Sequence, residues 1–349
     1  MELIELLKKA IKEKASDLHI LPAQPPLLRI DGELAPISDT PALTPEDSQR
    51  LIYSALSLSQ QKDFEKNLVG DIAVIYPKVG NFRLSILHQR RGIAGVFRVI
   101  PEKIPTFEEL NLPLVLKSLL NLSHGLILVT GATGSGKSTT LATMIDYINA
   151  MRACHILTIE DPIEFIFPVK KSAINQMQIH RDTPDVATAL RASLRQDPDV
   201  ILLAEMRDVE TVRLALTAAE TGHLVMATLH ASSAPLAISR IVDMFPTAEK
   251  GRIRNLLSET LQAVVCQTLV KRINSGRVAA FEVMLNTPAI RHLIRQDKIA
   301  HMLMTIQTSG DQGMFTLDQH LQELVAKRII SSTVARSATS NQGLFRFEL

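Results

Sequence analysis

The sequence predicts an α/β protein in which a small α+β domain precedes a larger domain built on a parallel β-sheet. Its 349 residues are enough for two domains, at roughly 150 residues per domain. Short strand-like runs separated by turns fill residues 1–100, whereas longer apolar runs alternate with helical segments over residues 114–349. Residues 101–113 carry three prolines and little periodicity, which predicts a linker between the domains.

The first domain is predicted to combine two helical stretches with five short strands. Apolar residues recur at helical spacing over residues 3–11, with lysines on the other face, and a second helical stretch lies near residues 45–57. Turn signals such as Asp31-Gly32 separate the strand-like runs. These runs are residues 17–20, 27–30, 71–76, 81–87 and 95–100.

The second domain contains four continuous apolar runs, which are typical of strands buried on both faces of a parallel sheet. They are GLILVT at 125–130, HILTIE at 155–160, DVILLAE at 199–205 and HLVMATLH at 223–230. We therefore expect a parallel sheet flanked by helices. After Ala234 the chain is predicted to be mostly helical, with an amphipathic helix over residues 316–326 and a weakly ordered end at 337–349.

Composition and charge argue against several classes of protein. The 38 Lys and Arg residues nearly balance the 36 Asp and Glu residues, giving a net charge of +2, and there is no Trp, so no nucleic-acid partner is expected. Cys154 and Cys266 belong to no CxxC pair, which argues against a zinc site and a disulfide framework and favours small buried side chains. No apolar stretch approaches the roughly 18 residues of a membrane span, so a cytoplasmic protein is expected.

A glycine-rich segment, GATGSGKST at 131–139, follows the first apolar run of the second domain and precedes a helical stretch. This is the P-loop pattern G-x4-G-K-S, whose backbone N–H groups surround the phosphates of ATP. Lys137 is expected to reach the β- and γ-phosphates, and the Ser138 hydroxyl to hold Mg²⁺. The alternative is a glycine-rich turn that binds no nucleotide. The predicted nucleotide-binding residues are Gly131, Thr133, Gly134, Ser135, Gly136, Lys137, Ser138 and Thr139.

Acidic residues follow two of the other predicted strands. The segment EDPIE at 160–164 carries three carboxylates, and Glu205 closes a later apolar run. Ligands of open parallel sheets bind beyond the carboxyl ends of the strands, where these acids are expected to lie. Glu160 and Glu164 are therefore candidates to activate the attacking water, and Glu205 is a candidate Mg²⁺ carboxylate. A solvated acidic turn and a surface glutamate are the alternatives.

Two histidines bound the last of these strands. The extended backbone places His223 and His230 about 23 Å apart, so they cannot share a metal ion. Only His230 lies at the carboxyl end, where it could contact the γ-phosphate or its water. A structural role is the alternative for His223.

Four arginines precede the predicted linker, at Arg83, Arg90, Arg91 and Arg98. Phosphoryl transfer gains from an arginine that neutralises charge in the transition state, often one supplied in trans. We expect members of this cluster to face a nucleotide held by the second domain of the same chain or of a neighbour. Ordinary surface arginines are the alternative.

Taken together, these motifs resemble the secretion ATPase superfamily and, within it, the PilT-type ATPases of type IV pilus retraction. The resemblance covers nearly the whole chain. The segments that carry it are SDLHI at 16–20, VFRVIP at 96–101, GATGSGKSTT at 131–140, TIEDPIEF at 158–165, LRQDPDVILLAEMRD at 194–208, LTAAETGHLVMATLH at 216–230 and TPAIRHLIR at 287–295.

The resemblance implies a PAS-like first domain, a RecA-like P-loop NTPase domain and a ring-shaped homohexamer. Its ATP turnover would drive domain rotations that are passed to an inner-membrane platform protein, with a paralogous retraction ATPase as a further partner. The implied location is cytoplasmic and peripheral, at the inner-membrane base of the pilus. The resemblance implies that Lys137 and Ser138 are the Walker A residues and that Glu205 is the Walker B carboxylate. Residues 160–164 match the aspartate box of the family, with Glu164 as the implied water-activating base. His223 and His230 bound the histidine box, and Arg83 and Arg98 match the arginines that contact the nucleotide.

Because of three departures from the family pattern, other classes of motor remain alternatives. Ala204 stands where the family usually has glycine, residues 175–178 (NQMQ) lack an Arg–Glu pair, and the tail after Val334 differs from the usual ending. A paralogous secretion, DNA-uptake or Dot/Icm-type motor is therefore the alternative. A RecA-like nucleic-acid motor would show ATPase stimulation by single-stranded DNA, and a nucleotide-binding scaffold would show no turnover.

Overall fold

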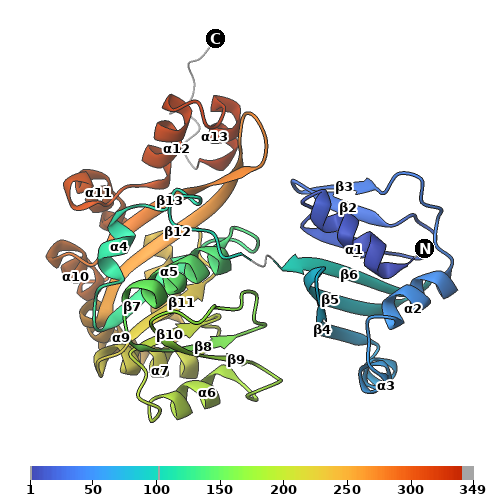
Figure 1. Ribbon diagram of the computed structural model, residues 1–349. Coiled ribbons are helices and arrows are strands. Elements are labelled where there is room, and N and C mark those ends of the chain that lie inside the picture. Colours follow the sequence, from blue (N-terminus) through green and yellow to red (C-terminus); the bar gives the residue numbers. More distant parts are fainter. Residues whose placement is uncertain (1, 101–102, 340–349) are drawn as a thin grey trace. The chain divides into compact units, whose positions relative to one another are not determined.

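The chain folds into two compact units, Met1–Lys103 and Ile104–Leu349 (Figure 1). The computed structural model describes residues 2–100 and 103–339. The predicted linker is too long, because Ile104, Phe107 and Leu112 are buried in a core cluster of the second unit. Residues 104–113 therefore belong to that unit, and residues 101–102 lie outside the described part of the chain.

The first unit is a six-stranded antiparallel sheet with helices against one face. The strand order is β3-β2-β1-β6-β5-β4. Leu18, Leu84 and Phe97 lie in one cross-strand row and are fully buried, whereas residues that alternate with them point to the opposite face. The elements are α1 (Leu3–Lys12), β1 (Asp17–Ile20), β2 (Leu27–Ile30), β3 (Glu33–Pro36), α2 (Pro45–Tyr53), α3 (Leu58–Asn67), β4 (Val69–Tyr76), β5 (Gly80–Gln89) and β6 (Gly92–Ile100).

The second unit is built on a seven-stranded sheet in the order β13-β12-β7-β11-β10-β8-β9. All neighbouring strands are parallel except β13, which is antiparallel to β12. Because β7 and β11 are adjacent and β10 follows, the carboxyl ends of these strands meet at one edge of the sheet. The strands are β7 (Gly125–Thr130), β8 (His155–Glu160), β9 (Ala173–Gln178), β10 (Val200–Leu203), β11 (Leu224–Leu229), β12 (Leu261–Lys271) and β13 (Arg277–Leu285).

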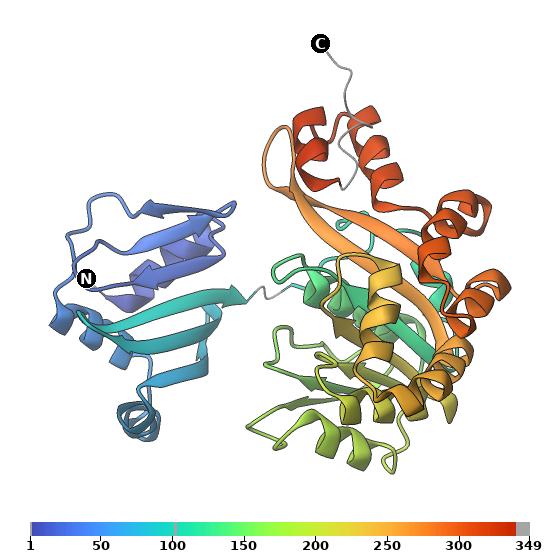
Figure 2. The same cartoon turned by 180° about the vertical axis from the view of Figure 1, so that it is seen from behind.

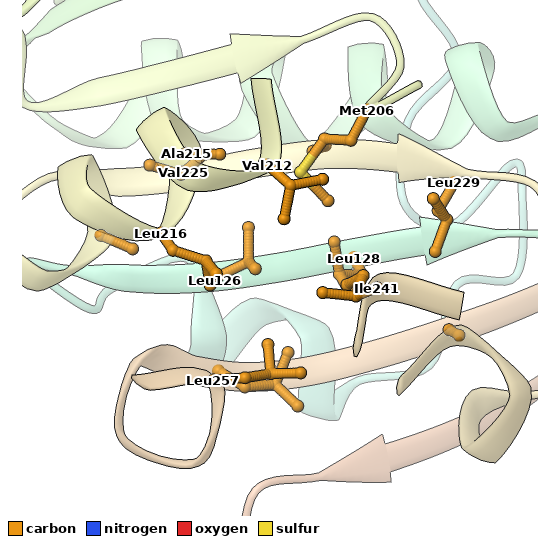
Figure 3. Close-up of a cluster of buried hydrophobic side chains, with 14 of the residues drawn as sticks. Leu126, Leu128, Met206, Val212, Ala215, Leu216, Val225, Leu229, Ile241 and Leu257 are labelled. Carbon is orange, nitrogen blue, oxygen red and sulfur yellow. The ribbon is translucent and has the colours of Figure 1, made fainter. Parts of the chain in front are cut away.

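Helices cover both faces of this sheet (Figures 1 and 2). Leu126 and Leu128 of β7 pack in one core cluster with side chains such as Val212, as Figure 3 shows, while Ile127 and Val129 pack in the other cluster with α5. This two-sided burial explains the continuous apolar runs. The helices are α4 (Val115–Leu119), α5 (Lys137–Met151), α6 (Val186–Ser193), α7 (Val209–Glu220), α8 (Ala234–Asp243), α9 (Thr247–Thr260), α10 (Pro288–Arg295), α11 (Met302–Thr308), α12 (Leu317–Ala326) and α13 (Ser332–Ala338).

The structure confirms the predicted fold class and the four buried parallel strands, together with the helix near residues 316–326. The expectation of a mostly helical region after Ala234 is wrong at the β12–β13 hairpin. Its β-branched residues, including Val264 and Val265, and the turn at Ser275-Gly276 are strand signals, but a short apolar run also fits a buried helix. The helix predicted near residues 45–57 ends at Tyr53, and a second helix that was not predicted begins at Leu58, with Ser57 as its cap.

The remaining expectations concern the cysteines, membrane spans and the end of the chain. Cys266 is buried and Cys154 is half-buried, and both are free. Over residues 2–100 and 103–339, none of the helices is long and apolar enough to cross a bilayer. The weakly ordered end predicted at 337–349 lies mainly outside the described residues, since Ala338 ends α13 and the description stops at Thr339.

Candidate active site

The P-loop connects the carboxyl end of β7 to α5, which begins at Lys137. Gly131, Gly134 and Gly136 have φ values of 140°, 78° and 89°, a region that residues with a Cβ rarely adopt. The first N–H groups of α5 have no partners within the helix, and they carry the positive end of its dipole. The loop therefore has the backbone conformation and the helix terminus that bind phosphate groups in P-loop NTPases.

Lys137 lies folded against this loop. Its Nζ donates hydrogen bonds to the carbonyl oxygens of Gly131 and Ala132, both at 2.9 Å. Burial lowers the pKa of Lys137, and the negative charges of Glu205 and Glu164 oppose this effect. Among the described residues no carboxylate forms an ion pair with this ammonium group, so its charge is available to an anionic ligand.

Glu205 and His230 come together at the carboxyl edge of the sheet. The imidazole Nε2 of His230 lies 3.2 Å from Glu205 Oε1, and its Nδ1 lies 3.3 Å from the carbonyl oxygen of Gly131. This bridge follows from the strand order, because β11, which precedes His230, lies between β7 and β10. Both ring nitrogens face acceptors, so a neutral ring can donate to only one of them at a time.

Arg207 is a charged residue of this edge that the sequence analysis did not single out. Its Nε donates to Glu205 Oε2 at 2.8 Å, and its Nη1 lies 3.6 Å from Asp161 Oδ2. A cavity of about 480 Å³ lies beside these three side chains and reaches the amino ends of α6 and α7. The sequence signals for Arg207 are its place two residues after the predicted Mg²⁺ carboxylate and its inclusion in the segment 194–208, which carries the family resemblance.

Glu160 lies at the end of β8 and is held by side chains. Its Oε1 accepts hydrogen bonds from Thr158 Oγ1 at 2.6 Å and from Gln176 Nε2 at 2.9 Å. Gln176, on β9, also donates to the carbonyl oxygen of Phe165 at 2.9 Å and accepts from the N–H of Phe167 at 3.1 Å. Glu160 and Gln176 thus hold the acidic loop that follows β8. Gln176 was noted in the sequence only as part of a departure from the family pattern.

Glu164 lies within this acidic loop. Its backbone N–H lies near the carboxylate of Glu160 and lowers the pKa of that group. Its side chain makes no hydrogen bond to any residue of 2–100 or 103–339, and its charge acts on Lys137. Burial raises the pKa of Glu160, and the nearby charge of Glu164 adds to this effect. The two glutamates of the aspartate box therefore have different surroundings: Glu160 is half-buried and hydrogen-bonded, whereas the carboxylate of Glu164 has no hydrogen bond to any described residue.

Two residues of this edge carry oxygen groups suited to Mg²⁺. Ser138 is exposed at the start of α5, and Glu205 follows β10, which β11 separates from β7. In the described part of the chain no group of three or more His, Cys, Asp or Glu residues could hold a metal ion. A magnesium ion at this place would take few protein ligands, which is how this cation binds beside substrate phosphates.

Arg83 and Arg98 belong to the first unit and lie opposite each other on β5 and β6, so they share one face of the sheet. Arg98 Nε donates to Asp17 Oδ1 at 3.0 Å, and Arg83 Nε donates to Asp71 Oδ1 at 2.8 Å. The structure therefore brings the two predicted arginines together and gives each a carboxylate on the same sheet.

Three other predicted residues lie outside these groups. Arg90 and Arg91 form the turn between β5 and β6, at the end of the hairpin and not in the row of Arg83 and Arg98. His223 lies just before β11, at the end of the strand opposite His230, and its Nδ1 lies 3.0 Å from the carbonyl oxygen of Ala218. This contact to the end of α7 fits the structural alternative for His223.

Comparisons with known proteins show the family of the chain. The chain matches the family described as Type II/IV secretion system protein over residues 2–336. It is 53% identical over 336 residues to the type IV pilus retraction ATPase PilT of Pseudomonas aeruginosa, covering 96% of this chain and 97% of that protein. It is 46% identical over 323 residues to a twitching motility protein of Neisseria gonorrhoeae, covering 92% and 86%.

Two solved structures are similar over most of the chain. The pilus retraction motor PilT with bound ADP aligns with a TM-score of 0.89 and 44% identity, covering 98% of each chain. The Legionella pneumophila ATPase DotB aligns with a TM-score of 0.84 and 27% identity, covering 95% of this chain and 93% of that one. The chain therefore belongs to the type II/IV secretion system protein family, within which it is similar to the PilT retraction ATPases.

Proposed function

We propose that this chain is a hexameric ATP-hydrolysing motor that powers type IV pilus retraction by coupling ATP turnover to rotation of its domains. The observation that carries the proposal is a P-loop whose Lys137 lies within reach of the charges of Glu205 and Glu164, in a chain 53% identical to a retraction ATPase over 96% of its length. The proposed location is the cytoplasmic face of the inner membrane. The proposed partners are a platform protein and a paralogous retraction ATPase.

ATP is proposed to bind with its phosphates inside the P-loop. The N–H groups of residues 133–139 surround the β- and γ-phosphates, and Lys137 leaves its two carbonyl partners to contact them. Mg²⁺, held by Ser138 and by Glu205 directly or through water, would neutralise charge on the phosphate oxygens. Thr139 lies in the first turn of α5, where it extends this phosphate-binding surface.

Glu164 is proposed to take the proton of the attacking water, because its carboxylate has no hydrogen bond within the described part of the chain and lies in a loop held by Glu160 and Gln176. His230, which bridges Glu205 and the P-loop carbonyl, is proposed to contact the γ-phosphate or its water. Glu160 then acts by holding the loop.

A Gln176→Met variant tests this support of the acidic loop. The substitution keeps the side-chain volume but removes the hydrogen bonds to Glu160, Phe165 and Phe167, so kcat is expected to fall about tenfold while the Kd for ATP stays unchanged. Steady-state ATPase kinetics and ATP titration measure the two quantities. Gln178→Met is the matched control, since Gln178 makes only one long contact to the loop, 3.4 Å to the N–H of Ile163. An equal loss in both variants would contradict a specific role for Gln176.

Arg83 and Arg98 are proposed to neutralise charge on the phosphates, with Arg83 acting on the nucleotide of a neighbouring subunit. When Arg83→Ala subunits are mixed equally with Lys137→Ala subunits, about a quarter of the sites are expected to regain ATPase activity, because an intact P-loop then meets the Arg83 of a neighbouring subunit. The measurement is ATPase activity against mixing ratio. Arg29→Ala is the control, since Arg29 lies in the same cross-strand row beside Asp17. A mixture as inactive as the two variants alone would show that Arg83 acts on its own nucleotide.

The direction of filament movement is tested in the host cell. Deleting the gene is expected to leave excess surface pili and abolish twitching, because assembly continues without retraction. Counting pili by electron microscopy gives the answer, and complementation by the wild-type gene is the control. Bald cells would instead indicate an assembly motor, and normal pili with normal twitching would favour a secretion or DNA-uptake motor.

A further inference from the structure

A single buried amide links the P-loop to the neighbouring strand. Gln267 of β12 is 3% exposed, and both polar groups of its side chain are used. Its Nε2 donates to the carbonyl oxygen of Ser135 at 2.7 Å, and its Oε1 accepts from Thr140 Oγ1 at 2.7 Å. One side chain therefore joins the loop, the first turn of α5 and the sheet.

Two P-loop glycines pack directly against the same residue. A Cβ on Gly131 would lie 2.2 Å from the carbonyl oxygen of Gln267, and a Cβ on Gly136 would lie 2.8 Å from its Nε2. This approach follows from the register of β12 on β7, in which Cys266 is opposite Thr130, the last residue of β7. The glycines thus allow Gln267 to reach the loop, in addition to permitting its positive φ values.

The hydrogen bond to Ser135 has a consequence for the opposite side of the loop. The C=O of Ser135 and the N–H of Gly136 belong to one planar trans peptide, in which the two groups point in opposite directions. Because the side chain of Gln267 holds this C=O toward β12, the N–H of Gly136 is held pointing away from β12. That N–H is one of the groups expected to bind phosphate.

We propose that Gln267 is a positioning residue for phosphate binding, which fixes the Ser135–Gly136 peptide in its binding orientation without touching the nucleotide. The proposal rests on the proposed function of the P-loop as the ATP site. It assigns the β12–β13 hairpin a part in ATP affinity: the strand beside β7 carries the amide that arranges the loop in advance of binding.

The test is a Gln267→Met variant of the full chain, which keeps the volume of the side chain and removes both hydrogen bonds. We expect the KM for ATP and the Kd for ADP to rise about tenfold, with kcat at saturating ATP within about twofold of wild type. The matched control is Gln262→Met, on the same strand. Gln262 packs against Gly125 at the other end of β7, so its replacement is expected to leave both constants unchanged.

The other possible results distinguish a failure of the inference about Gln267 from a failure of the proposed ATP site. Unchanged KM and Kd in Gln267→Met, with or without a lower Tm, would show a merely structural role and overturn the inference, as would an equal rise in Gln262→Met. Lys137→Ala is measured in parallel, because an unchanged Kd for ADP there would mean that the proposed ATP site itself is wrong. If Gln267→Met does not fold, a Thr140→Val variant replaces it as the test, because it removes the hydrogen bond that orients the side-chain amide of Gln267. A rise of about threefold in the Kd for ADP would support the inference, and no rise would overturn it.

Discussion

Replacing Lys137 with alanine is expected to raise the Kd for ATP at least about a hundredfold, which abolishes binding at ordinary concentrations. The ammonium group is half-buried and donates only to the neutral carbonyls of Gly131 and Ala132 among the described residues, so its charge is available to phosphates bound in the loop. With alanine at position 137, only backbone N–H groups would contact the negatively charged phosphates. Isothermal titration with ATP and ADP measures the effect.

The same variant should not lose stability in the absence of nucleotide. Burial lowers the pKa of Lys137, which means that the folded protein carries this charge at a cost compared with the unfolded chain at neutral pH. Removing the charge is therefore expected to leave the nucleotide-free Tm unchanged or slightly higher, while the rise in Tm caused by ADP disappears. Lys250→Ala is the control, since Lys250 pairs with Asp243 away from the P-loop. Normal ATP affinity in Lys137→Ala would contradict the P-loop assignment.

The parts of the fold that could be predicted are those in which neighbouring residues in sequence share one environment. The strand GLILVT is buried along its whole length, so its burial is visible as an apolar run, and the P-loop that follows it is a contiguous pattern of nine residues. The acids and the histidine at the edge could be placed for the same reason. Each directly follows a recognisable buried strand, and parallel strands end at one edge.

The parts that could not be predicted depend on contacts between distant segments. Gln267 lies 132 residues from Ser135 in sequence, and only the position of β12 beside β7 brings them together. That strand was predicted to be helical, so no sequence pattern pointed to its glutamine. In the same way, the strand register decides that Arg98 meets Asp17, 81 residues away. Local hydrophobic patterns contain neither strand order nor register.

A Glu164→Gln variant is expected to bind ATP with wild-type affinity and to lose about a thousandfold in kcat. The amide has the size and shape of the carboxyl group, but it cannot accept the proton of the attacking water. Phosphate release measures turnover, and nucleotide titration measures binding. Glu323→Gln on α12, which removes only a surface ion pair with Lys327, is the control for the chemistry of the substitution.

A Glu160→Gln variant separates the two glutamates of the aspartate box. Burial raises the pKa of Glu160, and the nearby charge of Glu164 adds to this effect, so the two carboxylates differ in their surroundings. Its Oε1 is also occupied by Thr158 and Gln176, whereas the carboxylate of Glu164 is unbonded among the described residues. Glu160→Gln is therefore expected to cost far less turnover than Glu164→Gln. The reverse order would mean that Glu160 is the base, and it would require the acidic loop to leave the arrangement that Gln176 maintains.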